Sequence, residues 1–146
     1  MKEGKTSSVS PGASVEHLYT QSELEQMDTD ELDAIAFGCR SGEVKTLKPS
    51  AIRIKYPCDL ENPQHRFEQE GMAWVRSVSL DDPVSVSVDD NGVFWLEDGH
   101  HRWFAAAKLG VKLQAQMEIK GNPVRAIMVR QEASISKIPE YCVREI

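Results

Sequence analysis

Residues 95–110, WLEDGHHRWFAAAKLG, constrain the fold of this chain more than any other segment. An apolar run ends in the pair Asp98-Gly99, and a helical pattern follows at once and stops at Gly110, a residue suited to a helix C-terminus. Directly afterwards VKLQAQMEI alternates apolar and polar residues over 111–119, which predicts a half-buried strand. A strand, a helix and a strand in this order predict a helix packed on a sheet.

Two further stretches predict more of this sheet. Valines alternate with serines over 84–88, and the turn residues DDNG at 89–92 join them to the apolar run 93–96, which predicts a hairpin. Earlier in the chain, 44–47 and the alternating SAIRIK at 50–55 predict short strands. The segment Val124–Val129, which follows Gly-Asn-Pro, is predicted as a last strand.

The remaining patterns predict helices. Apolar residues lie near helical spacing over 22–37, with Ser22 or Asp28 as the N-cap, and residues 64–78 predict a second helix with Gly71 as its weak point. We therefore expect an α+β fold, a single compact domain with a small mixed sheet and flanking helices. The chain divides into a mobile tail (1–14), an acidic helical segment (15–43), the domain itself (44–130) and a C-terminal extension (131–146).

Charge is unevenly distributed along the 146 residues. The total of 17 Lys+Arg against 23 Asp+Glu gives a net charge of -6, which excludes a uniformly basic protein that coats DNA. Residues 6–39 hold seven acidic residues and no Lys or Arg, whereas 99–146 hold eight Lys+Arg against four Glu, a balance of +4. The acidic helical segment is expected to be a solvated surface, or alternatively a docking site for a basic protein partner.

The cysteine content and the N-terminal sequence indicate the cellular compartment of the protein. Cys39, Cys58 and Cys142 are odd in number and too widely spaced for a metal knuckle or a redox pair, which indicates reduced thiols. Residues 1–17 lack the apolar core of a signal peptide, and no run approaches the ~18 apolar residues that cross a bilayer. We expect a cytoplasmic protein with no membrane partner.

The start of the helix at residue 100 is the candidate site. Asp98 is placed as the N-cap, and Gly99 lets the backbone approach a ligand. The first turn then reads His100, His101 and Arg102, although a helix N-terminus carries partial positive charge and usually attracts acidic residues. Basic groups at this position predict a site that binds a phosphate or another anion through backbone N–H groups and the Arg102 guanidinium.

Other interpretations of the same residues stay open. Arg102 could pair with Asp98, Glu97 or another carboxylate, and the histidines could be ordinary surface residues. Adjacent histidines point about 100° apart on a helix and do not form a metal site alone, although His65 could complete one. Trp103 is expected in the core, and stacking on a nucleobase is the alternative.

The segment DGHHRWFAAAKLG resembles the signature box of the ParB/sulfiredoxin superfamily, in which a Gly, a His or Arg, and an Arg before an alanine-rich helix bind nucleotide phosphates. The upstream LKPSAIRI, the pair Asn62-Pro63 with Arg66, and DPVSVSVDDNGVFWL are similar to the N-terminal part of ParB domains. The resemblance spans about residues 45–129, so it implies a ParB/sulfiredoxin-like domain over 44–130.

The resemblance also implies ligands and roles. Gly99, His101 and Arg102 match phosphate-binding positions, His100 adjoins them, and Arg66 matches the upstream arginine. Members that resemble ParB hydrolyse CTP, those that resemble sulfiredoxin use ATP to repair a cysteine, and others phosphorylate serine or act as nucleases. His100 stands where sulfiredoxin has its nucleophilic cysteine, so we expect no such repair reaction. Neither a helix-turn-helix region nor the serine kinases' upstream glutamate motif is evident.

Three functions follow as hypotheses. The first is an enzyme that binds ATP or CTP with Mg²⁺ and hydrolyses or transfers the terminal phosphoryl group, with Asp98, Glu97 and His101 as candidate catalytic residues and Gly99, His100, His101, Arg102 and Arg66 as binding residues. The second is a nuclease that acts on DNA through the same anion site. The third is a non-catalytic module that senses a nucleotide or docks a protein.

Overall fold

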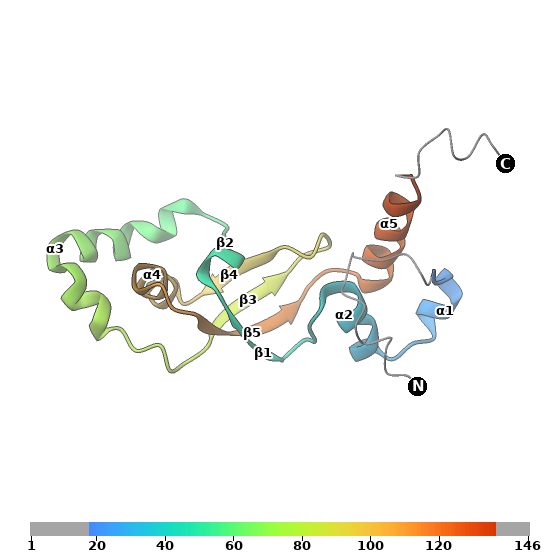
Figure 1. The fold of residues 1–146 in the computed structure, drawn as a ribbon, viewed down its shortest axis with the longest axis horizontal. Helices are drawn as coiled ribbons and strands as arrows, with labels where there is room; N and C mark the ends of the chain where they lie inside the picture. The colour runs from blue at the N-terminus through green and yellow to red at the C-terminus, as the bar shows by residue number, and fades with distance from the viewer. Residues whose placement is uncertain (1–17, 137–146) are drawn as a thin grey trace.

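The predicted alternating segments assemble into one five-stranded sheet in this computed structural model, which describes residues 18–136 (Figure 1). The strands are β1 (Val44–Leu47), β2 (Arg53–Ile54), β3 (Val84–Val88), β4 (Phe94–Asp98) and β5 (Leu113–Ile119). The α-helices are α1 (Gln21–Glu25), α2 (Thr29–Phe37), α3 (Glu61–Ser77), α4 (His100–Leu109) and α5 (Pro123–Ser136), and the short 3₁₀ helices are η2 (Pro49–Ala51) and η3 (Pro57–Leu60).

The sheet is mixed, with the strand order β1-β5-β3-β4-β2. β3 pairs with β4 antiparallel and with β5 parallel, while β1 lies antiparallel to β5 and β2 lies parallel to β4. An α+β domain with a small mixed sheet and flanking helices is thus confirmed.

Alternation along the strands places their valine, leucine and methionine side chains in one core. Val84, Val86 and Val88 are almost fully buried, and Leu24 and Phe37 from the acidic helical segment pack in the same core cluster. The helices α1 and α2 therefore belong to the same hydrophobic core as the sheet. A second, smaller cluster joins α3 to α4 through Trp74, Val75, Phe104 and Ala105.

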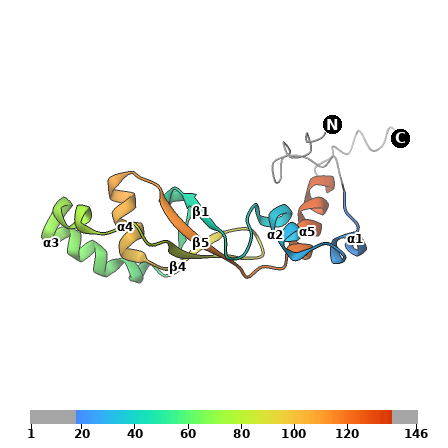
Figure 2. The same ribbon diagram turned by 90° about the horizontal axis from the view of Figure 1, so that it is seen from below.

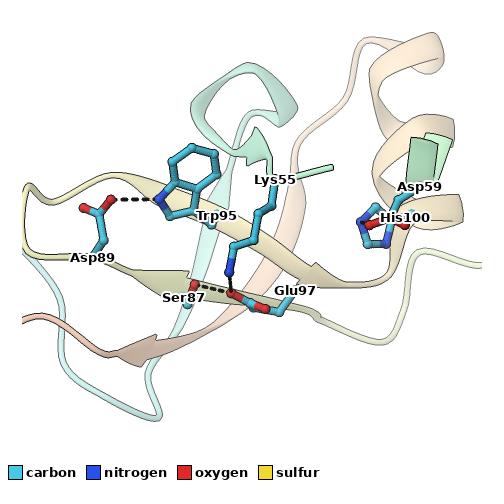
Figure 3. A network of polar contacts seen from close by, with 7 residues as sticks. All are labelled: Lys55, Asp59, Ser87, Asp89, Trp95, Glu97 and His100. Atoms are coloured by element: carbon cyan, nitrogen blue, oxygen red, sulfur yellow. Dashed lines mark hydrogen bonds and ion pairs between the residues drawn. The ribbon is translucent and has the colours of Figure 1, made fainter. Parts of the chain in front are cut away.

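The hairpin turn between β3 and β4 is organised by one carboxylate. Asp89 accepts hydrogen bonds from the backbone N–H groups of Asn91 and Val93, both at 2.9 Å, and from the Trp95 indole at 2.8 Å (Figure 3). Burial by itself raises the pKa of Asp89, but these three hydrogen bonds and the charge of Arg53 outweigh it and hold the pKa below the ordinary value.

The prediction of a single helix over 22–37 is wrong, because two helices occupy this stretch. Thr20 caps α1 in a capping box with Glu23, and Asp28 caps α2 by accepting from the Asp30 N–H, so the chain breaks between them. The alternative of Asp28 as an N-cap is confirmed. α2 ends at Gly38, whose φ of 75° is left-handed.

The strand predicted at Val124–Val129 is also wrong, since these residues lie in α5. The Asn122 side chain accepts a hydrogen bond from the Arg125 N–H at 3.1 Å, its carbonyl accepts from the Ala126 N–H, and Pro123 stands at the first helical position. Asparagine as a cap and proline directly after it are helix-start signals. α5 continues past residue 130, and Arg130 donates to the carbonyls of Ile35 and Ala36 at the end of α2.

The predicted helix over 64–78 begins earlier, at Glu61, and bends in the middle. Gly71 has φ 66° and ψ -155°, which is not helical, so α3 consists of two helical parts. Gly71 was the expected weak point, and a left-handed φ is one that glycine adopts readily.

The molecule is elongated, with α3 and α4 at one end of the sheet and α1, α2 and α5 at the other (Figures 1 and 2). The acidic helices therefore lie far from α4. One carboxyl group of these helices, that of Asp33, is only 3% exposed, so it is not a surface charge. Burial, together with the neighbouring Asp30, raises the pKa of Asp33.

Between residues 18 and 136, no helix is both long and apolar enough to span a bilayer. The predicted tail, 1–14, lies outside the described residues, and the divisions at 43 and 130 stay predictions.

Asp89→Ala should destabilise the domain by about 1–3 kcal/mol at neutral pH, because three donors lose a charged acceptor. The folded-state pKa is lowered, so this contribution is present above the ordinary value of 3.8 and is lost as the pH falls through the folded pKa. Urea denaturation at pH 7 and at a series of acid pH values measures the difference. Asn91→Ala in the same loop is the control, and an equal loss there would contradict the role of Asp89.

Candidate functional site

A β-bulge shapes the end of β4. Val86 pairs with Leu96, but the residue before it in β3, Ser85, pairs with Asp98, so Glu97 is an extra residue in β4. Successive side chains of a regular strand point to opposite faces, and a bulge relaxes that rule. It explains why Glu97 and Asp98 both line the same pocket.

Gly99 joins the bulge to α4. It is the N-cap of α4 with φ 99° and makes no side-chain cap, so the predicted capping by Asp98 is wrong. A Cβ atom at position 99 would lie 2.6 Å from Val84 Cγ1, which leaves no space for a side chain. The N–H of Trp103 donates to the Gly99 carbonyl at 2.9 Å and begins the helical hydrogen bonds. The first turn of α4 therefore carries no carboxylate cap, and its N–H groups stay available to a ligand.

An open pocket of about 530 Å³ surrounds this helix start. Seven residues line it, and they are Asp59, Glu97, Asp98, Gly99, His100, His101 and Arg102. Six of the seven come from one continuous segment, and Asp59 comes from η3. The structure thus brings together Glu97, Asp98 and the four predicted binding residues from 99 to 102.

Arg102 is held by the backbone rather than by a carboxylate. Its Nη1 donates to the carbonyl oxygens of Asp82 at 2.9 Å and Pro83 at 2.8 Å, just before β3. Its Nη2 lies beside Gly99, 3.1 Å from the position that a Cβ there would take. No hydrogen bond from Nη2 or Nε is found within residues 18–136. The guanidinium is therefore held in place through Nη1, while Nη2 and Nε can donate hydrogen bonds to an anion.

His101 connects α4 to α3. Its Nε2 lies 2.8 Å from Asn62 Oδ1, and its ring meets the Trp74 ring edge to face at 6.1 Å. Asn62 belongs to the Asn62-Pro63 pair in the first turn of α3. The hydrogen bond places the proton on Nε2 as donor, since the amide oxygen only accepts. Nδ1 of the neutral ring is then the nitrogen that can accept.

His100 lies beside the one pocket residue from η3. Its Nε2 is 3.5 Å from the Asp59 carboxylate, and its side chain is 17% exposed (Figure 3). This nitrogen is buried and has no hydrogen-bond partner among the described residues. Asp59 and His100 therefore form a contact that is not a well-formed hydrogen bond.

Glu97 is hydrogen-bonded to β3 and to the residue that directly follows β2. One carboxylate oxygen, Oε2, accepts from Ser87 Oγ at 2.5 Å and from Lys55 Nζ at 3.0 Å (Figure 3). The hydrogen bond from Ser87 and then that from Lys55 lower the pKa of Glu97, and Lys55 in turn has a raised pKa because of Glu97. The carboxylate is ionised at neutral pH and points toward Ser87 and Lys55 (Figure 3), and Glu97 is one of the residues that line the pocket at the start of α4.

Two predicted residues lie elsewhere. Arg66 bonds Glu70 at 2.7 Å on the surface of α3 and its guanidinium lies 5.4 Å from the Trp74 ring centre, so it is outside the pocket lining. His65 is exposed on α3 and does not line the pocket either. No group of three His, Cys, Asp or Glu side chains in the described part of the chain could hold a metal ion.

Four residues that sequence reasoning missed as site residues are Lys55, Asp59, Asn62 and Ser87. Asn62 belongs to the Asn62-Pro63 pair, but nothing near it in the sequence indicates His101 as its partner. Ser87 is one of several serines in β3, and only the strand register places it beside Glu97. Trp103, which was expected in the core, is partly buried, and its indole donates a hydrogen bond to the Pro49 carbonyl at 3.0 Å.

No family model and no curated protein matches the sequence. Among solved structures, sulfiredoxin from Arabidopsis thaliana matches with 22% identity over 54% of this chain and 88% of that chain, at a TM-score of 0.42. The C-terminally truncated chromosome-partitioning protein ParB from Caulobacter crescentus, complexed with CTP-gamma-S, matches with 13% identity over 67% of this chain, at a TM-score of 0.35. The chain spans 56% of that ParB structure.

Gly99→Ala should lower the stability by about 2–5 kcal/mol, because the new methyl group meets Val84 and the backbone stays left-handed. Gly110→Ala is a matched control, since Gly110 also has a left-handed φ of 69° but nothing within 4 Å of its added Cβ. That variant should lose only about 1 kcal/mol. Thermal and urea unfolding measure both, and equal losses would show that the contact with Val84 does not matter.

Proposed function

We propose that the pocket at the start of α4 binds the phosphates of a nucleoside triphosphate and that the protein hydrolyses or transfers the terminal phosphoryl group. The observation that carries the proposal is the uncapped N-terminus of α4 with the half-free Arg102 guanidinium beside Gly99. A carboxylate cap would occupy the N–H groups that an anion needs, and here it is absent. The pocket therefore offers backbone donors, a fixed cation and room.

The binding roles follow from the contacts. The N–H groups of the first turn and Arg102 would hold phosphate oxygens, since guanidinium and helix N-termini are strong donors to phosphate. His101 would add a donor or acceptor, with its ring orientation set by Asn62. Arg66 lies outside the pocket and is assigned no phosphate contact.

Catalysis at such a site would come from positioning and charge neutralisation. Glu97 and Asp98 are the carboxylates at the pocket edge, where an attacking water or hydroxyl group would approach. Mg²⁺ is expected to arrive on the triphosphate, because Mg²⁺ is usually bound through substrate phosphates with few protein ligands. The described residues do not form a metal site of their own, so no step is assigned to a protein-bound metal.

The resemblance of DGHHRWFAAAKLG to the superfamily box supports ATP or CTP as the nucleotide. The geometry of the pocket gives less support to the nuclease and docking hypotheses. The described residues offer no three-ligand metal group for a metal-dependent nuclease, so DNA is not part of the proposal. A protein partner on α1 and α2 would dock at the end of the molecule remote from the nucleotide.

ATP or CTP with Mg²⁺ should raise the melting temperature, since a ligand at a hundred times its Kd stabilises the folded state by about 2.7 kcal/mol. Arg102→Gln should weaken nucleotide binding by at least about tenfold, because the fixed charge is lost while one amide donor remains for the carbonyls. Calorimetric titration measures the affinity, and analysis of the recovered nucleotide measures its conversion to diphosphate.

Arg76→Gln is the matched control. It removes the same charge from an exposed residue in the last turn of α3, away from the pocket. Equal weakening in both variants would show only a general charge effect. Failure of ATP, CTP and GTP to bind at millimolar concentration would reject the proposal. Recovery of a bound nucleotide that stays intact would favour a non-catalytic sensing module over an enzyme.

A further inference from the structure

The bulged residue Glu97 is held from two sides by residues with no role in the phosphate site. Ser87 on β3 is 3% exposed, and its hydroxyl donates to Glu97 Oε2 at 2.5 Å. Lys55, directly after β2, donates to the same oxygen at 3.0 Å. A buried hydroxyl and an ammonium group thus converge on one carboxylate oxygen at the pocket edge (Figure 3).

This arrangement leaves the second oxygen of Glu97 unused. No described residue donates a hydrogen bond to Oε1, while the side chain as a whole is 29% exposed. Because both bonds go to Oε2, the torsion angles of the carboxylate are restricted and Oε1 has a defined position. A surface ion pair alone would contribute little order, but the hydroxyl that completes this one is buried.

We propose that Glu97 Oε1 accepts a hydrogen bond from the O–H group that attacks the terminal phosphoryl group, and that Ser87 and Lys55 are positioning residues that hold Glu97 for this role. The inference rests on the proposed function. Glu97 is the catalytic residue of the three, since it contacts the attacking group, and Ser87 and Lys55 act only through it.

Phosphoryl transfer exchanges one phosphorus–oxygen bond for another. The oxygen of the attacking water or hydroxyl group forms a bond to the terminal phosphorus, and the bond from that phosphorus to the bridging oxygen breaks. The nucleoside diphosphate leaves with the electron pair. The proton of the attacking group, oriented by Oε1, ends on an oxygen of the transferred phosphoryl group, because an ionised carboxylate with a lowered pKa holds a proton weakly.

Several charges act on Glu97 at once. Lys55 and, from the segment after β5, Lys120 supply positive charge that favours its ionised form. The other charged or titratable side chains that line the pocket are Asp59, Asp98, His100, His101 and Arg102. The hydrogen bond from Ser87 is nevertheless the largest single cause of the lowered pKa of Glu97. Removing this hydrogen bond should therefore shift the pKa of Glu97 measurably, even without any substrate.

Ser87→Ala is the decisive variant. Carbon-13 NMR of the Glu97 carboxyl group should show its titration moving upward, toward the ordinary glutamate value of 4.5. With nucleotide, kcat should fall roughly 10- to 100-fold while nucleotide affinity stays unchanged, because the phosphate-binding groups are untouched. The low-pH limb of the pH–rate profile should move to higher pH, and Ser87→Thr, which keeps the hydroxyl, should restore kcat.

Ser85→Ala is the matched control, since Ser85 is exposed on the same strand and its hydroxyl makes no hydrogen bond among residues 18–136. It should alter neither the titration nor kcat. If Ser87→Ala unfolds, Lys55→Met removes the other support from the surface and should raise the Glu97 pKa as well. An unmoved titration in a folded variant overturns the positioning inference. Absence of turnover in the unaltered protein overturns the proposed enzyme instead, so the two failures are distinct.

Discussion

The close contact between Gly99 and Val84 decides how the sheet meets the helix in this protein. Gly99 turns the chain with a φ of 99° against the side chain that begins β3, in a space that admits no Cβ. Arg102, one turn along α4, then reaches the carbonyls of Asp82 and Pro83 that lead into the same strand. The helix start is thereby fixed to the sheet at two points, and its free N–H groups are presented at the strand ends.

Three polar residues at the pocket have a structural partner as well as a free group. Arg102 uses Nη1 for the backbone, His101 uses Nε2 for Asn62, and Glu97 uses Oε2 for Ser87 and Lys55. Such partial use restricts the side chains before a ligand arrives and lowers the entropy lost on binding. Pre-organisation of this kind is what a phosphoryl-transfer site needs, because it acts by positioning.

Local sequence patterns predicted most elements but failed where cap chemistry and apolar spacing competed. The hairpin, α4 and β5 follow from alternation and from glycine at helix ends. Val124–Val129 is rich in residues typical of strands, yet Asn122 and Pro123 begin a helix there, and Ile127 is buried in the core. Asp28 likewise divides one predicted helix into two, because its side chain caps the second.

Residues 97–102 are recognisable as the candidate site from the amino-acid sequence, because the strand end, the glycine and the basic helix start are local and contiguous features. The distant groups that complete the site depend on the three-dimensional fold: strand register and helix packing bring in Lys55, Asp59, Asn62 and Ser87, and they turn Arg66 away toward Glu70. A one-residue bulge in β4 and the packing of α3 on α4 set these side-chain directions, and neither leaves a local signature in the sequence.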